Sequence, residues 1–242
     1  MNFQWEIKEF IKSVVAEPVS LSNEIIYLKD RGLKFTLKPL ARDVSWGTER
    51  VIWEDQWWWK KEIVKSRIRS VLGLTMRIHG RETQVVKVAQ PVANAFLNDN
   101  HLIGATSSKT KLALVKQKQI FALATFSKPT KINRDGSIYR SYELIRYCNF
   151  NNHTVVGGLS KLINHFVALE GPDDIMTYVD KEWSEGSAFQ KLGFKEIGEI
   201  PPRDFWVDTK TMTRYWNQPE SKTGEIVKVS NLGSRKLILF LK

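Results

Sequence analysis

Three residues that could take part in acid–base chemistry stand near the ends of predicted elements. His101 closes a predicted helix in PVANAFLNDNHL, and Asp180 ends a predicted strand in DDIMTYVD. A histidine beside a carboxylate can act as a general base with its orienting partner, or hold a metal ion with a third ligand. The alternative is that His101 meets backbone carbonyls at the helix end and Asp180 caps the next helix. Arg146, on the predicted strand SYELIRYCNF, is a third candidate, with a salt-bridged structural arginine as its alternative.

A pair of glycines could bind a phosphate group. HTVVGGLSKLINHFVAL predicts a strand, a tight turn and a helix, with Val156, Gly157, Gly158 and Ser160 at the turn. Glycine allows the chain to approach a ligand closely, and backbone N–H groups at a helix N-terminus attract anions. These four residues are the predicted cofactor contacts. An ordinary tight turn would use the same glycines.

The distribution of positive charge points to a polyanionic partner. The net charge is +11, and two stretches hold much of it. Trp57 to Arg81 carries seven Lys or Arg against one acid, and Gly104 to Arg134 carries seven and no acid. A solvated face is the alternative, but such runs favour phosphate contact, most simply with double-stranded DNA. The predicted nucleic-acid contacts are Lys60, Lys61, Lys65, Arg67, Ser108, Lys109 and Lys111.

The elements that must position these residues follow a regular order after Glu82. The pattern predicts a helix, a hairpin, a strand, a glycine turn into a helix, a strand, a short helix and a strand. This order favours an α+β fold with a mostly antiparallel sheet flanked by helices over residues 82–242. Residues 1–81 are predicted as a small N-terminal extension with a basic, Trp-rich helix. Adjacent residues on a helix point about 100° apart, so Trp57, Trp58 and Trp59 cannot all be core, and packing rather than base stacking is the favoured role for them.

Composition excludes several classes of protein. No apolar run approaches the ~18–20 residues of a membrane span, so no membrane partner is expected. The N-terminal sequence MNFQWEIKEF has charges where a signal peptide needs apolar residues. A single cysteine, Cys148, cannot form an internal disulfide, which fits a reducing, cytoplasmic setting. We expect Cys148 to be a buried strand residue.

A family resemblance rests on several motifs. Ser187 to Phe194, SAFQKLGF, resembles the short helix ending in "YEKLGF" of the GNAT acyltransferase superfamily, as does the order of elements. The segments WEDQWWWKKEIVKSRI, FLNDNHLIG, ELIRYCN, VVGGLSKL and YVDKEWSEGSAFQKLGF are similar to the C-terminal region of Hef-like phage homing endonucleases. That region is related to Mom-type phage proteins, which modify adenine in DNA. The resemblance implies a GNAT-like fold in which His101 and Asp180 both end near a central cleft.

The resemblance also implies a function, with departures. It implies acyl-type transfer to N6 of an adenine in DNA, from an acyl-CoA-type donor or with help from a divalent metal. The family's Gln or Arg before the glycine turn falls on Thr154 or Val155, and Phe189 stands where many acetyltransferases have a proton-donating tyrosine. Two alternatives therefore stay open: a non-catalytic DNA-binding protein derived from a homing endonuclease, and an ordinary acetyl-CoA-dependent N-acetyltransferase. Residues 1–55 have no D…E-x-K arrangement, so DNA cutting is not expected even from a degenerate nuclease remnant.

Overall fold

The chain forms two compact units that alternate along the sequence. The computed structural model describes residues 2–40, 50–134, 136–220 and 224–242. Unit 1 comprises Met1–Ile68, Asp180–Glu185 and Glu199–Ser234, and unit 2 comprises Arg69–Val179, Gly186–Gly198 and Arg235–Lys242. The domain boundary predicted between residues 81 and 82 stays a prediction, because the chain passes from one unit to the other several times.

Unit 2 is built on one sheet, which the chain enters at β6 and leaves at β17. The strand order is β13-β17-β12-β10-β8-β7-β6, and β9 pairs with β10. The neighbours β6–β7, β7–β8, β8–β10 and β9–β10 are antiparallel, and β10–β12 is parallel. The strands are β6 (Gln84–Lys87), β7 (Thr110–Lys116), β8 (Gln119–Phe126), β9 (Thr130–Arg134), β10 (Ser137–Asn149), β12 (Asp174–Asp180), β13 (Lys195–Ile200) and β17 (Ser234–Phe240).

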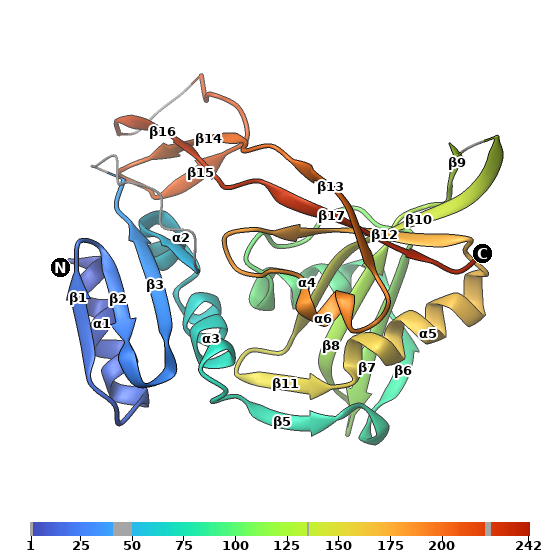
Figure 1. Ribbon diagram of the computed structural model, residues 1–242, viewed down its shortest axis with the longest axis horizontal. Helices are drawn as coiled ribbons and strands as arrows, with labels where there is room; N and C mark the ends of the chain where they lie inside the picture. Colours follow the sequence, from blue (N-terminus) through green and yellow to red (C-terminus); the bar gives the residue numbers. More distant parts are fainter. Residues whose placement is uncertain (1, 41–49, 135, 221–223) are drawn as a thin grey trace. The chain divides into compact units, whose positions relative to one another are not determined.

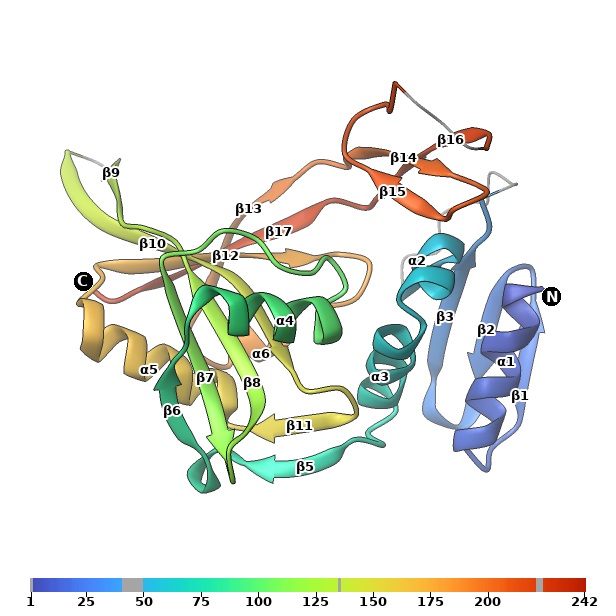
Figure 2. The same ribbon diagram turned by 180° about the vertical axis from the view of Figure 1, so that it is seen from behind.

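Helices cover both faces of this sheet. Figures 1 and 2 show α5 (Gly158–Glu170) on one face and α4 (Gln90–Asn100) on the other. The short helix α6 (Ser187–Gln190) follows β12. The order is the predicted one: helix, hairpin, strand, glycine turn into a helix, strand, short helix and strand. The predicted α+β fold, with a mostly antiparallel sheet flanked by helices, is confirmed.

Alternation along the strands explains why both faces need cover. Successive strand residues point to opposite faces. Leu112, Leu114, Phe126 and Tyr142 pack with Phe166 of α5, and the Phe126 and Phe166 rings stack at 3.7 Å. On the other face, Ala113, Leu123 and Cys148 pack with Ala93 and Leu97 of α4. The apolar strands of the sheet therefore contribute core residues on both faces, as a sheet covered by helices on both sides requires.

A smaller ribbon lies beside the start of α5. β5 (Met76–His79) pairs in parallel with β11 (His153–Val156), and the 3-10 turn η2 (Gly80–Glu82) follows β5. β11 leads through Gly157 directly into α5. The ribbon therefore fixes the approach of the chain to the glycine turn.

Unit 1 combines two small sheets with helices. Its elements are α1 (Phe3–Val14), β1 (Val19–Ser22), β2 (Ile25–Leu28), η1 (Lys29–Arg31), β3 (Leu33–Lys38), β4 (Val51–Trp53), α2 (Glu54–Trp59), β14 (Asp204–Asp208), β15 (Thr213–Tyr215), β16 (Ile226–Ser230) and most of α3 (Lys61–Val71). α1 is amphipathic and buries Phe3, Ile7 and Ile11. Trp57 is fully buried and Trp59 is 58% exposed, which confirms that the three tryptophans are not all core.

No helix in the described part of the chain is both long and apolar enough to cross a membrane.

Candidate functional site

The central feature of unit 2 is the place where β10 and β12 stop pairing. Their parallel pairing covers Ser141–Glu143 and Asp174–Met176. β10 continues beside β8 to Asn149, with a register shift between Leu144 and Arg146 that leaves Ile145 as an extra residue. Just past the last backbone pair, the Thr177 hydroxyl donates to the Leu144 carbonyl oxygen at 3.0 Å. Beyond this point β10 has backbone groups on its β12 side that no strand of the described chain pairs.

The glycine turn lies toward the same end of the sheet. α5 connects the parallel strands β10 and β12 along the chain: it begins after β10 and β11 and ends before β12. Gly157 has φ +74°, the left-handed conformation that glycine adopts without steric cost. A Cβ atom on Gly158 would lie 2.9 Å from Val155 Cβ and 3.0 Å from Leu114 Cδ1. The first N–H groups of α5 have no partner within the helix, and they face the N-terminal side with its partial positive charge.

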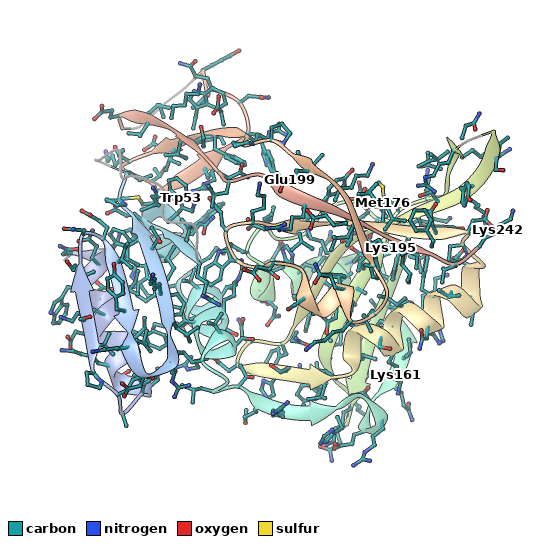
Figure 3. The ribbon with its side chains drawn as sticks, in the orientation of Figure 1. Trp53, Lys161, Met176, Lys195, Glu199 and Lys242 are labelled. Atoms are coloured by element: carbon teal, nitrogen blue, oxygen red, sulfur yellow. The ribbon has the colours of Figure 1, made fainter. Side chains whose placement is uncertain are left out.

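Side chains from the neighbouring ribbon surround this turn. Lys161, labelled in Figure 3, donates from Nζ to the Gly80 carbonyl oxygen at 3.0 Å and to the Thr83 carbonyl oxygen. This holds η2 against the first turn of α5. Arg77 on β5 is exposed and lies in register with Thr154. A guanidinium from β5 therefore stands beside the position at which the sequence lacks the family's Gln or Arg.

A row of polar residues crosses the α4 face of the sheet. Lys111 on β7 is paired with Thr125 on β8, and Thr125 is paired with Arg146 on β10. Side chains of directly paired residues share a face and lie within about 5.5 Å at Cβ. Lys111 Nζ donates to Gln90 Oε1 at 2.8 Å and to the Ser108 carbonyl oxygen at 3.0 Å. The row thus joins three strands to the loop after α4.

Two hydroxyls in this region have no hydrogen-bond partner among the described residues. They are Thr125 Oγ1 and Ser108 Oγ, and Thr125 is 1% exposed. Arg146 donates from Nε to the Gly104 carbonyl oxygen at 3.3 Å and from a guanidinium nitrogen to the Ile145 carbonyl oxygen at 2.9 Å. The row is therefore rich in hydrogen-bond donors.

Arg146 interacts electrostatically with Glu143, which lies three residues before it on β10. Burial lowers the pKa of Arg146, and the charge of Glu143 opposes that shift. Burial likewise raises the pKa of Glu143, against the effect of Arg146. Glu143 is the last residue of β10 that pairs with β12, opposite Met176, which Figure 3 labels. A partly desolvated carboxyl therefore stands where the strands part.

The structure gathers residues that the sequence had assigned to separate roles. Ser108 and Lys111, predicted as nucleic-acid contacts, lie with Arg146, a predicted catalytic residue, around Thr125. Lys109 is exposed next to them. Thr125 was missed, because one threonine in the apolar strand IFALATF gives no signal of a site until its neighbours across the sheet are known.

His101 and Asp180 belong to different units, so their pairing stays a prediction. His101 caps the end of α4, where its Nδ1 accepts a hydrogen bond from the Ile103 N–H at 3.2 Å. Asp180 Oδ1 accepts from the Glu182 N–H at 2.9 Å. His101 therefore has a local contact to a backbone N–H, whereas the alternative to a catalytic role was a contact to helix-end carbonyls. Asp180 contacts the turn after β12, and the N-cap of the next helix, α6, is Gly186. The described residues contain no group of three or more His, Cys, Asp or Glu that could hold a metal ion.

Asp180 is part of a buried charge cluster within unit 1. Burial and the charge of Asp180 raise the pKa of Glu182, whose Oε1 accepts from Trp53 Nε1 at 3.0 Å. The Arg67 guanidinium stacks 4.0 Å from the Trp183 ring centre. Burial lowers the pKa of Arg67 to about 10, against the charges of Asp180 and Glu182. Arg67 therefore interacts with protein groups at a partly buried position.

The predicted DNA-contacting lysines in α3 and at the end of α2 also have partners within unit 1. Lys61 Nζ lies 2.7 Å from Glu6 Oε2, and Lys65 Nζ lies 2.8 Å from Glu62 Oε1. Lys60 lies over the exposed Trp59 ring at 5.5 Å. These pairs are partly exposed and weak, so they can exchange for phosphate contacts at small cost.

Two further predicted features have clear structural roles. Phe189 packs edge-on against Phe194 at 5.4 Å in the α5-side core, and its ring has no proton to donate. Cys148 is a strand residue as predicted, but it is half-buried rather than buried. It packs against the α4-side core, and desolvation raises the pKa of its thiol to about 12.

The sequence matches no protein-family model and no curated protein. Solved structures with similar arrangements include acetyltransferases. One from Elizabethkingia anophelis, with acetyl-CoA bound, is 12% identical with a TM-score of 0.43 over 66% of this chain and 99% of that one. A Bacillus subtilis acetyltransferase in complex with CoA is 11% identical with a TM-score of 0.41, over 66% and 99%. The IAA acetyltransferase of Bacillus cereus is 12% identical with a TM-score of 0.39, over the same shares. Identities and TM-scores this low say nothing about substrate or activity.

Proposed function

We propose that unit 2 is an N-acyltransferase, which moves an acyl group from a CoA-type thioester to an amine. The observation that carries this proposal is the end of β10–β12 pairing at Glu143 and Met176, toward the end of the sheet where Gly157 opens α5. Unpaired strand backbone and a helix N-terminus together offer N–H groups to a carbonyl oxygen and to phosphate oxygens. Such preorganised donors are a common source of catalysis in acyl transfer.

The chain offers a fit for each charged part of such a donor. The donor, when bound, supplies an acyl carbonyl activated by its thioester bond. N–H groups of β10 beyond the bulge at Ile145 would donate to that carbonyl oxygen. The first turn of α5 and the exposed guanidinium of Arg77 would hold the pyrophosphate. The glycines matter here because a Cβ atom at Gly158 would crowd Val155 and Leu114 and push the first turn out of place.

Glu143 is the residue best placed to accept the amine proton. It lies at the point where the strands part, and burial raises its pKa. A carboxylate with a raised pKa is a stronger base near neutral pH. Because Phe189 cannot protonate the departing thiolate, that proton must come from solvent.

A comparison of two glycine variants tests the donor site. Gly158→Ala should weaken acetyl-CoA binding by about tenfold or more, because the first turn of α5 must shift. Gly171→Ala is the matched control, since Gly171 caps the other end of α5 with φ +56° and has open space around it. It should lower stability but leave affinity unchanged. Equal loss of binding in both variants would mean that only helix stability matters.

A second candidate acceptor is a base in DNA, as in Mom-type modification of adenine N6. The observation that favours it is the segregation of charge. Unit 2 carries 19 Lys and Arg against 8 Asp and Glu, whereas unit 1 carries 18 of each, so the net charge of +11 belongs to unit 2. A catalytic unit this basic suits a polyanionic substrate. Mass spectrometry of nucleosides from DNA of cells that express the protein tests this candidate, and unmodified DNA alongside folded protein would argue for a small-molecule amine.

A further inference from the structure

The polar row on the α4 face is the strongest feature that the donor site does not use. Its members converge from three strands and one loop. Lys111, Thr125 and Arg146 are neighbours by strand register, and Ser108 is tied to Lys111 through its carbonyl oxygen. All four residues lie within unit 2.

The unpaired hydroxyls require an explanation. A buried polar group without a partner costs stability, and valine has the shape of threonine without the hydroxyl. Thr125 is nevertheless 1% exposed with Oγ1 unbonded, and Ser108 Oγ is also a buried, unbonded atom, on a half-buried residue. A protein retains such groups at a cost when a ligand uses them.

The donors in the row match an anion with several acceptor oxygens. Lysine has three N–H donors and arginine five, and Lys111 and Arg146 each use two of them in bonds to protein groups, so both have further donors for a ligand. The two hydroxyls add two more. A tetrahedral phosphoryl group can accept from all four side chains, which a planar carboxylate with two oxygens cannot do as fully. Glu143, the carboxyl beside Arg146, has a raised pKa because of its burial, which weakens its competition with such an anion.

We propose that Ser108, Lys111, Thr125 and Arg146 form a site for a phosphoryl group of the acceptor, and that the acceptor is a nucleotide unit of a nucleic-acid strand. The statement that the phosphoryl group belongs to an acyl acceptor rests on the proposed function. The phosphate site itself is argued from the polar row alone. The nucleotide is inferred from the charge of unit 2, because the whole excess of +11 belongs to the unit that contains this site. The amine to be acylated then lies toward Glu143, the neighbour of Arg146 on β10.

The first experiment measures phosphate binding and stability in the same variants. Calorimetric titration of the full chain with inorganic phosphate should show saturable binding. Thr125→Val should weaken that binding by about tenfold. The same variant should raise the melting temperature by about 2–4 °C, because it removes a buried unpaired hydroxyl. A loss of phosphate affinity together with a higher melting temperature would indicate that the Thr125 hydroxyl serves ligand binding rather than stability.

Thr110→Val is the matched control. Thr110 is on the same strand as Lys111, is also 1% exposed, and points to the opposite face, where its hydroxyl donates to Glu170 Oε1 at 3.2 Å. The control should lower the melting temperature and leave phosphate affinity unchanged. If Thr125→Val instead lowers stability and leaves phosphate affinity unchanged, Thr125 is a packing residue and the proposal is wrong.

A second set of titrations identifies the source of the phosphate. Deoxyadenosine 5′-monophosphate and a single-stranded oligodeoxynucleotide should each bind more tightly than inorganic phosphate, and each should lose affinity in Lys111→Met. Lys116→Met, which removes an exposed lysine paired with Glu82 at 2.6 Å, is the control. Binding of inorganic phosphate without any gain from the nucleotide would overturn the nucleotide assignment. Binding of acetate as tightly as phosphate would overturn the phosphoryl assignment.

These results are separable from the proposed transfer activity. Phosphate and nucleotide titrations need no acyl donor, so they can succeed even if acetyl-CoA does not bind. In that event the phosphate site stands and the acyltransferase proposal falls. Acyl transfer to simple amines, without binding of inorganic phosphate, nucleotide or oligonucleotide, would support the acyltransferase proposal and overturn the phosphoryl site.

Discussion

The Thr177 hydroxyl donates to the Leu144 carbonyl oxygen at 3.0 Å, just where backbone pairing between β10 and β12 ends. At that point the Thr177 side chain, instead of a backbone N–H of β12, donates the hydrogen bond to the Leu144 carbonyl oxygen. Thr177 is 4% exposed, so water is a poor substitute for its hydroxyl. The bond therefore marks the last link between the strands before the proposed acyl site begins.

Thr177→Val should destabilise the protein by about 1–2 kcal/mol, because the buried Leu144 carbonyl loses its donor. Acyl transfer should fall more than stability alone explains, since the position of β10 beyond the link changes. Chemical denaturation and steady-state kinetics measure the two effects. Thr177→Ser keeps the hydroxyl and should restore both, and failure of serine to do so would show that the methyl group matters instead.

Glu143→Gln should lower kcat by about 10²–10³-fold with little change in KM, if Glu143 takes the amine proton. The wild-type rate should fall as pH drops below the pKa of Glu143, which burial raises above the ordinary carboxyl range. The glutamine variant should lack this acidic limb. A pH–rate profile that is unchanged in the variant would remove Glu143 from the mechanism.

The Asp55–Arg214 pair should dominate the stability of unit 1. Arg214 meets Asp55 in two bonds, at 2.7 and 2.8 Å, and Asp55 is 1% exposed. Arg214→Met should cost about 3–5 kcal/mol, because it leaves a buried carboxylate without its partner. Adding Asp55→Leu should recover much of that loss. A double variant as unstable as the single one would show that Arg214 acts mainly through its stacking on Trp53 and Phe205.

Cys148 should react slowly with thiol reagents in the folded protein. Burial raises its thiol pKa to about 12, so at pH 8 the reactive thiolate is scarce. Ellman's reagent should modify the folded chain at least about 100-fold more slowly than the denatured one. Because the unfolded thiol ionises at lower pH, this group should also reduce stability as pH rises from its ordinary pKa toward 12. Fast labelling at pH 8 would indicate local opening of β10.

Periodicity was enough to predict the fold, but not the site. The apolar runs in TKLALVK and QIFALATF, and the helical spacing of apolar residues in GLSKLINHF, each predict one element from local pattern alone. Thr125 and Arg77 could not be found that way. Their importance comes from register with Arg146 and with Thr154, across pairs that are 21 and 77 residues apart in sequence. Strand register depends on the whole sheet, and no local pattern encodes it.

The environment of Arg67 could not be predicted from local sequence either. The seven Lys and Arg between Trp57 and Arg81 predict a solvated or phosphate-binding face, yet Arg67 stacks on Trp183, which is 116 residues away. Charge counts report how many cations a segment has. Only tertiary packing decides which of them are used within the protein.

Calorimetric titration of the full chain with acetyl-CoA measures whether unit 2 binds a CoA-type thioester. Saturable binding of one donor per chain is expected, weakened in Gly158→Ala and preserved in Gly171→Ala. No measurable binding to a folded chain, at acetyl-CoA concentrations up to about 1 mM, would show that unit 2 is not a CoA-dependent acyltransferase.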